Sequence, residues 1–269
     1  MTMTENLEDR SNADAPAGAE GGQASPRDPV TFLELLPTED RNALIERCTR
    51  RVLTRRQVVF SRGEPRTSVF ILRTGLVKLQ RQTSAGNDVI LTLCGPGELI
   101  GFSGLSRSTA RVASAQVVEA GEALAIDDAD FRALMATRPA IALAVIESMR
   151  WRMESVSDAL TDIVSEDVPN RIVRLLQRLA VGKGQRRNGE WAIDLRLTHQ
   201  EMANMIGARR QTVTTALNDL HRLGVLRRDQ HRVVIPSKPP RAGATARSMF
   251  WAFAASGASL LALDFAILV

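Results

Sequence analysis

The chain has 269 residues, of which 44% are hydrophobic and 24% charged, a globular composition that excludes wholesale disorder and collagen-like repeats. Its length suffices for two domains of ordinary size, and its formal net charge of +5 permits a polyanionic partner. Two cysteines, Cys48 and Cys94, are too few for a four-cysteine iron–sulfur cluster, and they form neither a disulfide framework nor a zinc motif. A reducing cytoplasm is therefore expected. The first residues lack the basic-then-apolar run of a signal peptide, so we expect none.

The charge is distributed unevenly along the chain. Residues 1–28 carry six acidic and two basic side chains, and residues 29–166 carry 17 of each kind. Residues 167–248 carry 16 basic and six acidic side chains. A neutral part joined to a strongly basic part suggests a sensor attached to a nucleic-acid reader, and a basic surface without a partner is the alternative.

The N-terminal half is predicted to be a disordered arm over residues 1–28, then a short helix over Glu39–Cys48, then a β-rich region. In this region short apolar or alternating runs are separated by glycine-containing turns, a pattern that predicts an antiparallel sandwich or barrel. The runs are Gln57–Ser61, Val69–Leu72, Leu76–Gln80, Val89–Cys94 and Val117–Ile126.

Helical periodicity follows, with a helix from Asp130 to Met135, closed by Arg138-Pro139, and a long helix over residues 140–165. Six apolar side chains of the long helix recur at alternating spacings of three and four, which favours homodimerisation through an a/d seam. An ordinary amphipathic helix lying on the β-rich region is the alternative. The dimer seam consists of Ile146, Met149, Met153, Val156, Leu160 and Ile163.

Val168-Pro169 marks a predicted domain boundary, after which a helix, a polar loop over Gly182–Gly189 and a strand over Trp191–Leu197 are expected. The apolar stripe of this helix is Ile172, Leu175, Leu176 and Leu179.

A helix-turn-helix follows the predicted strand. Thr198-His199-Gln200-Glu201 has the pattern of a capping box, and the helix that it starts stops at Gly207. A second helix is expected from about Arg209 to Leu223, and the tight glycine turn between the two predicts a helix-turn-helix. Val225–Ile235 then reads as the hairpin wing of a winged helix, with its tip near Arg227–Gln230.

The second helix has the residues of a DNA-reading helix at its start, where base edges of the major groove are met. Arg suits guanine, Gln suits adenine, and Thr can meet a thymine methyl group. A solvated helix end is the alternative, although two arginines at the positive end of a helix dipole do not serve stability. The predicted DNA contacts are Thr198, His199, Gln200, Arg209, Arg210, Gln211, Thr214, Thr215, Arg227 and Arg228.

Over roughly residues 30–236 these motifs together resemble the CRP/FNR (cyclic-AMP receptor protein/FNR) family of bacterial transcription regulators. The resemblance rests on the segment Gly95–Gly101, the long helix, the helix-turn-helix and a set of turn glycines. These glycines are Gly63, Gly75, Gly86, Gly97 and Gly101.

The resemblance implies an α+β homodimer that binds double-stranded DNA at a two-fold-symmetric operator and has RNA polymerase as a further partner. It implies an N-terminal antiparallel β-roll of the cyclic-nucleotide-binding type over 29–138, a dimerisation helix over 139–166, and a C-terminal winged helix-turn-helix domain over 167–236. The best-known members place Glu after the Arg of the reading helix and Arg four residues later. Gln211 and Thr215 stand there in this chain, so we do not expect the same DNA half-sites.

Cyclic-nucleotide binders of the family carry Gly-Glu for the ribose and, about ten residues later, Arg-Ser/Thr-Ala for the phosphate. Here Gly101 is followed by Phe102, and Arg111-Val112-Ala113 stands at the second motif. An alternative alignment places the phosphate motif at Arg107–Ala110. It keeps the hydroxyl residue of the motif but shortens the loop after Gly101. An unpaired ribose hydroxyl in a buried pocket costs about 1–3 kcal/mol, so we expect an unknown effector other than cyclic AMP. The expected effector pocket is formed by Gly101, Phe102, Arg111, Val112 and Val156.

No cofactor or metal is predicted, because the three histidines, His199, His221 and His231, all lie in the DNA-binding half and lack metal-ligand spacing. The chain also lacks a catalytic constellation and a phosphate loop, so an enzyme is not expected. The main prediction is a homodimeric transcription regulator, and a ligand-sensing signalling module without specific DNA recognition is the alternative.

The chain ends in a polar linker over 237–248 and an apolar run over 249–269 whose single charged side chain is Asp264. About 20 apolar residues suffice to span a bilayer, and preceding basic residues fit a cytoplasmic body. Three interpretations are open: a membrane anchor, a helix docked on the protein's own surface or in the dimer, and an altered end without function.

Overall fold

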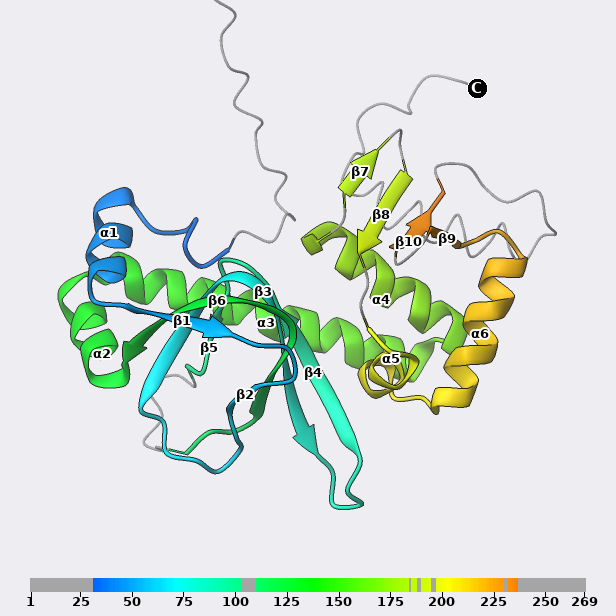
Figure 1. The fold of residues 1–269 in the computed structure, drawn as a ribbon, viewed down its shortest axis with the longest axis horizontal. Helices are drawn as coiled ribbons and strands as arrows, with labels where there is room; N and C mark the ends of the chain where they lie inside the picture. The colour runs from blue at the N-terminus through cyan, green and yellow to red at the C-terminus, as the bar shows by residue number, and fades with distance from the viewer. Residues whose placement is uncertain are drawn as a thin grey trace, which may run out of the picture.

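The computed structural model describes residues 31–102, 110–183, 185–187, 190–194, 197–229 and 232–236. An N-terminal and a C-terminal domain lie along one long helix, α3 (Pro139–Ser165), as Figure 1 shows. The predicted arm over 1–28, the linker over 237–248 and the apolar run over 249–269 lie outside the described residues. Among the helices of the described ranges, none has the length and apolarity needed to cross a membrane.

The N-terminal domain is built around an antiparallel sheet with strand order β1-β6-β3-β4, in which β2 also pairs with β6 and β5 with β3. Helices α1 (Thr38–Glu46) and α2 (Asp128–Thr137) lie beside the start of α3 (Figure 1). This confirms the predicted antiparallel β-roll. The strands are β1 (Thr49–Leu53), β2 (Val58–Phe60), β3 (Ser68–Gln82), β4 (Asp88–Cys94), β5 (Leu99–Ile100) and β6 (Ser114–Asp127).

Strand β3 merges two runs that the sequence had separated at Thr74-Gly75, so the prediction of a turn there is wrong. The register with β6 shifts on both sides of Thr74, and the ladder then continues to Gln80. Gly75 has φ +85°, and a Cβ there would lie 2.7 Å from the Glu119 carbonyl oxygen. The glycine therefore makes a bulge within one long strand, because only glycine tolerates both the angle and the close approach.

The C-terminal domain packs three helices against a sheet of strand order β7-β8-β10-β9. The predicted polar loop over Gly182–Gly189 is wrong in part, because β7 lies within it and pairs with β8. The helices and strands are α4 (Val168–Lys183), β7 (Gln185–Arg187), β8 (Glu190–Asp194), α5 (His199–Ile206), α6 (Arg210–Arg222), β9 (Arg227–Asp229) and β10 (Arg232–Ile235).

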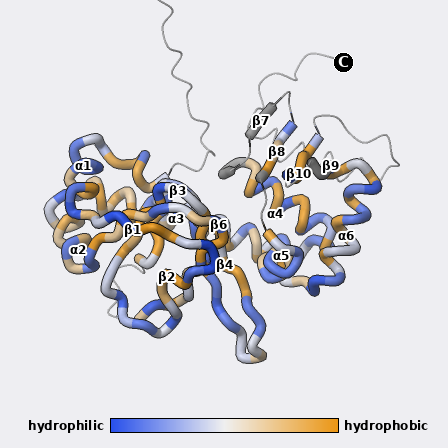
Figure 2. The backbone as a smooth tube through the Cα atoms, viewed as in Figure 1, coloured by the Kyte–Doolittle hydropathy of each residue, from blue (hydrophilic) through white to orange (hydrophobic). Residues whose placement is uncertain are grey.

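Apolar residues form the interior of each domain, and Figure 2 shows hydrophobic and hydrophilic stretches alternating along α4 and α6. The stripe predicted for α4 is confirmed, since Ile172, Leu175, Leu176 and Leu179 are all buried. They join one cluster with α5 and α6, and this cluster also includes residues of β3, β4 and β6. The core of the C-terminal domain is thus continuous with one face of the N-terminal sheet.

Candidate functional site

The helix-turn-helix begins with the predicted capping box. The Thr198 hydroxyl accepts a hydrogen bond from the Glu201 backbone N–H at 3.1 Å, and a Glu201 carboxylate oxygen accepts from the Thr198 N–H at 3.0 Å. Gly207 ends α5 with φ +63°, the left-handed conformation of a helix C-cap. These two local signals fix where α5 starts and stops, and so set the turn that leads into α6.

Helix α6 buries one stripe and exposes its first turn. Its buried residues are Val213, Ala216, Leu217 and Leu220, which face the domain core. Among the predicted DNA contacts, Arg209, Arg210, Gln211 and Thr215 are exposed, as are Thr198 and Gln200 at the start of α5. The structure therefore leaves the proposed base-reading turn open to a partner.

Thr214 is engaged between the two helices of the motif. Its hydroxyl donates to the Arg210 carbonyl oxygen at 3.0 Å and lies 2.9 Å from Nδ1 of His199. The Thr214 hydroxyl therefore contacts both the first residue of α6 and the first residue of α5. Thr214 thus ties α5 to α6, a positioning role that sequence reasoning did not find.

The wing carries the remaining predicted contacts. The Arg227 guanidinium donates to Glu190 at 2.7 Å, so this arginine is tied to β8. Strand β9 occupies Arg227–Asp229 and pairs antiparallel with β10, and residues 230 and 231 between the two strands lie outside the described residues. The backbone of Arg228 pairs with Val233, while its side chain lies outside the described part of the chain.

In the predicted effector pocket, Arg111 is bound by the protein itself. Its guanidinium donates to the carbonyl oxygens of Gly101 at 2.6 Å and Ser68 at 2.7 Å. It also lies over the Phe60 ring, 4.2 Å from the centroid, and the residue is only 6% exposed. Arg111 therefore connects the start of β3, the end of β5 and the start of β6.

A second arginine, Arg66, adds positive charge near Arg111. Arg66 is also buried and pairs with Asp128 at 2.9 Å. Burial lowers the pKa of Arg111 and the Arg66 charge lowers it further, while Asp128 and Glu64 act in the opposite direction. Carbonyl oxygens and one carboxylate hold this pair of buried cations.

Phe102 lies in the hydrophobic core and is 8% exposed. Its ring meets Phe131 edge-on at a centroid distance of 5.5 Å. The position that follows Gly101 therefore belongs to the packing between β-roll and helices, where a carboxylate would be desolvated. In the single chain Val112 is 60% exposed and Val156 44% exposed. The alternative alignment falls mostly on residues 103–109, outside the described ranges.

Replacing Arg111 by Met should lower the free energy of unfolding by about 3 kcal/mol, because two partly buried carbonyl oxygens lose a charged donor. Urea unfolding followed by circular dichroism measures this. Arg62→Met, which removes an exposed arginine of the same domain, serves as the control. A loss no larger than that of the control would show that the Arg111 contacts are not structural.

Arg152 of α3 is a second residue that sequence reasoning missed. Its guanidinium donates to the Leu99 carbonyl oxygen of β5 at 2.7 Å and lies 3.9 Å from the sulfur of Cys94. The contact joins the long helix to the sheet next to Gly101. The sequence does not indicate this role of Arg152, because its partners are a backbone carbonyl and a cysteine that lie more than fifty residues away in the chain.

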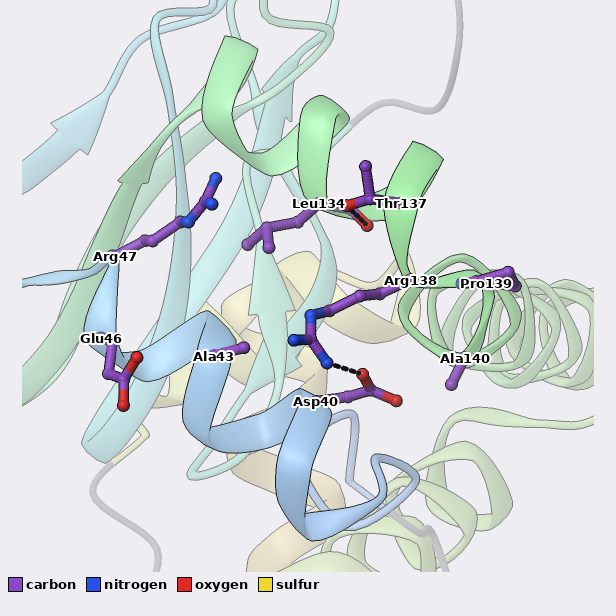
Figure 3. Close-up of a pocket in the computed structure, with 9 residues that line it drawn as sticks. All are labelled: Asp40, Ala43, Glu46, Arg47, Leu134, Thr137, Arg138, Pro139 and Ala140. Atoms are coloured by element: carbon purple, nitrogen blue, oxygen red, sulfur yellow. Dashed lines mark hydrogen bonds and ion pairs between the residues drawn. The ribbon is translucent and has the colours of Figure 1, made fainter.

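A cleft of about 660 Å³ lies elsewhere, between α1 and the junction of α2 with α3 (Figure 3). Arg138 and Asp40 form an ion pair in it at 2.7 Å. It includes no residue of the predicted effector pocket. Its lining comes from several elements without a motif and consists of Asp40, Ala43, Glu46, Arg47, Leu134, Thr137, Arg138, Pro139 and Ala140.

The predicted dimer seam is largely exposed in the single chain. Met149 is half-buried and packs against the core of the N-terminal domain, whereas the other five members face solvent. Their exposures are Ile146 63%, Met153 69%, Val156 44%, Leu160 62% and Ile163 41%. Over the ranges that the structure covers, no group of three or more His, Cys, Asp or Glu side chains could hold a metal ion.

Comparison with known proteins agrees with this arrangement. Residues 50–138 match the family of the cyclic nucleotide-binding domain, and residues 170–239 match the Crp-like helix-turn-helix domain. A CRP-like cAMP-activated global transcriptional regulator of Mycobacterium tuberculosis is 30% identical over 181 residues, which cover 67% of this chain and 81% of that protein. The chain belongs to the CRP/FNR family. As a CRP/FNR protein it is a transcription regulator with a helix-turn-helix DNA-binding domain, not an enzyme.

Other CRP/FNR relatives support the same assignment. The cyclic AMP receptor protein of Thermus thermophilus is 31% identical over 196 residues, covering 71% of this chain and 86% of that protein. Among solved structures, the c-di-GMP responsive global regulator CLP of Xanthomonas campestris has a TM-score of 0.65 at 22% identity, covering 75% of this chain and 100% of that one. A CooA mutant of Carboxydothermus hydrogenoformans has a TM-score of 0.64 at 21% identity, with coverages of 78% and 93%. At these identities the solved structures show the fold alone.

Proposed function

We propose that this regulator binds a two-fold-symmetric DNA operator as a homodimer, in the cytoplasm, and acts on transcription with RNA polymerase as its partner. The observation that carries the proposal is the exposed first turn of α6, with Arg210 and Gln211, on a helix whose apolar stripe is buried in the domain core. A C₂ dimer presents two such helices about one turn of DNA apart. Selection of bound duplexes from a random pool tests this, and recovery of sequences without two-fold symmetry would contradict it.

The dimer part of the proposal is supported by the exposed seam. A stripe of apolar side chains on one side of a 27-residue helix is costly to leave in water, and a second copy of the same helix covers it in register. The charged residues Arg150, Glu154 and Asp158 lie off the seam, as interhelical packing requires.

The effector part of the proposal rests on Phe102 and Arg111. The relatives from M. tuberculosis and T. thermophilus are named for cyclic AMP. In this chain Phe102 fills core space, and Arg111 already donates to two backbone carbonyls. A cyclic nucleotide would have to break these contacts and would find no carboxylate after Gly101 for its ribose.

We expect little or no response to cyclic AMP. Titration calorimetry at neutral pH should detect no binding at micromolar nucleotide, and the melting temperature should stay unchanged in millimolar cyclic AMP. A parallel panel of cyclic dinucleotides and small metabolites searches for the effector. Micromolar binding of cyclic AMP would mean that the Arg111 contacts open and that Phe102 is not next to the ribose.

A further inference from the structure

We propose that Lys78, a residue of the N-terminal sheet, positions the helix-turn-helix for DNA through its ion pair with Glu201. This inference rests on the proposed DNA-binding function and adds a positioning residue outside the DNA-binding domain. Lys78 lies on β3, in the middle of the sheet, and Glu201 lies in the first turn of α5. The pair therefore joins the sensing half of the chain to the start of the reading motif.

The contact is short and shielded. Nζ of Lys78 lies 2.9 Å from Oε1 of Glu201, and the two side chains are 13% and 18% exposed. The other carboxylate oxygen, Oε2, accepts from the Thr198 N–H at 3.0 Å. The Glu201 carboxylate thus binds both the N-cap residue of α5 and Lys78 of the other domain. A displacement of Lys78 therefore displaces the residue that completes the cap of α5.

The ion pair stands at the edge of an apolar contact between the domains. Strand β4 lies beside α5, and Figure 1 shows the strand approaching the helix. Leu76, Ile90, Leu93 and Val118 from the N-terminal sheet belong to the same buried cluster as residues of α5 such as Met202. This contact resists separation of the two domains, and the ion pair adds a directional constraint that apolar packing lacks.

The protonation state of Glu201 agrees with this role. Burial alone would raise its pKa, but the Thr198 N–H and the Lys78 ammonium outweigh burial, so the pKa lies below the usual value. Glu201 is therefore charged at neutral pH and needs a cation, because a buried unpaired carboxylate is costly. Lys78 is the cation that the fold supplies.

The docked arrangement is compatible with DNA binding. While α5 rests on the sheet, Arg210, Gln211 and Thr215 remain exposed. Lys78 also neutralises a carboxylate that lies one residue from Gln200, at the helix start where phosphates are expected to bind. Docking therefore fixes the orientation of the reading helix and removes a charge that would repel the DNA backbone.

Strand β3 also gives Lys78 a physical connection to the predicted effector region. Ser68, the first residue of β3, accepts a hydrogen bond from Arg111, and Lys78 lies farther along the same strand. A rearrangement around Arg111 would act on the first residue of β3, and Lys78 of the same strand binds Glu201 of the DNA-binding domain. The reading motif is thus held by the element that an effector would disturb.

The test compares Lys78→Met with the conservative Lys78→Arg. Specific affinity is measured by fluorescence anisotropy on a duplex selected from a random pool, and non-specific affinity on a scrambled duplex at the same salt concentration. We expect Lys78→Met to weaken specific binding about tenfold, within the usual range of coupling between sites, and Lys78→Arg to restore it to within about threefold. Arg81→Met removes an exposed cation from the same strand and should weaken both duplexes slightly and equally. Equal effects of Lys78→Met and Arg81→Met would overturn the proposal.

A second variant separates positioning from direct contact of Lys78 with DNA. Glu201→Gln keeps a residue that completes the capping box and removes the charge. We expect it to weaken specific binding, and the double variant with Lys78→Met to lose no more than Lys78→Met alone. If Lys78 contacts phosphate directly, Glu201→Gln leaves binding unchanged or stronger and the two effects add, which would refute a positioning role.

A measurement without DNA keeps this inference distinct from the proposed function. Lys78→Met should speed amide hydrogen exchange in β4 and α5, while Arg81→Met should not. If no duplex binds the unaltered protein, the proposed DNA-binding function fails, and with it the claim that Lys78 serves DNA reading. If exchange in α5 is unchanged by Lys78→Met, the positioning contact itself is refuted.

Discussion

Replacing Arg210 by Ala should weaken binding to the selected operator by about 1–3 kcal/mol and relax base preference at one position of each half-site. Arg210 is the first residue of α6, it is exposed, and its backbone carbonyl is fixed by Thr214. A guanidinium held at this place can donate two hydrogen bonds to one guanine edge. Anisotropy titrations on the selected duplex and on duplexes changed at each single position measure the effect.

The control for Arg210 lies at the other end of the same helix. Arg222 is exposed there and pairs with Asp219 at 2.9 Å, so Arg222→Ala removes the same charge far from the reading turn. It should weaken specific and scrambled duplexes alike, if at all, because it alters only the overall attraction to phosphate. Equal losses on both duplexes for Arg210→Ala would show that Arg210 reads no base.

Local signals made the reading motif predictable from the sequence. The Thr198 cap, Glu201 three residues later and the stop at Gly207 determine α5 through contacts within a few residues of one another. The buried stripe of α4 and the positive φ angles of Gly63 and Gly101 were predictable for the same reason. The stripe follows from the spacing of apolar residues, and the positive φ angles follow from the positions of glycine, and both are visible in the sequence.

Features that depend on distant residues were not predictable. The ladder of β3 passes through Gly75 because β6 lies opposite, and the exposed strand β1 carries too many arginines to show an alternating pattern. The contact between Thr214 and His199, at 2.9 Å, joins two helices, and no local pattern in the sequence indicates it. The pair Lys78–Glu201 spans more than a hundred residues, and no local pattern predicts it.

The dimer seam depends on a local pattern in the sequence and on contacts with distant residues. Its 3-4 spacing is readable in the sequence, but the same spacing also fits a helix that lies on its own domain. In the single chain five of the six residues are exposed, whereas Met149 packs against the core of the N-terminal domain. Leu143 and Val164, exposed at 65% and 82%, extend the apolar surface toward both ends of α3. The contact with a second copy is therefore expected in the middle and C-terminal part of α3.

Replacing Met153 by Lys should convert the protein from dimer to monomer at micromolar concentration. Met153 is 69% exposed in the single chain, so the substitution leaves the fold of one subunit intact, whereas a two-fold axis places two lysines in the apolar seam. Burying two unpaired charges costs about 4 kcal/mol or more, which raises the dissociation constant of the dimer about a thousandfold. Asp158→Lys, on the same helix but off the seam, should stay dimeric. Sedimentation velocity measures both variants. The monomer should bind the full operator about as tightly as a duplex that carries a single half-site. A Met153→Lys variant that remains dimeric would place the interface on another surface.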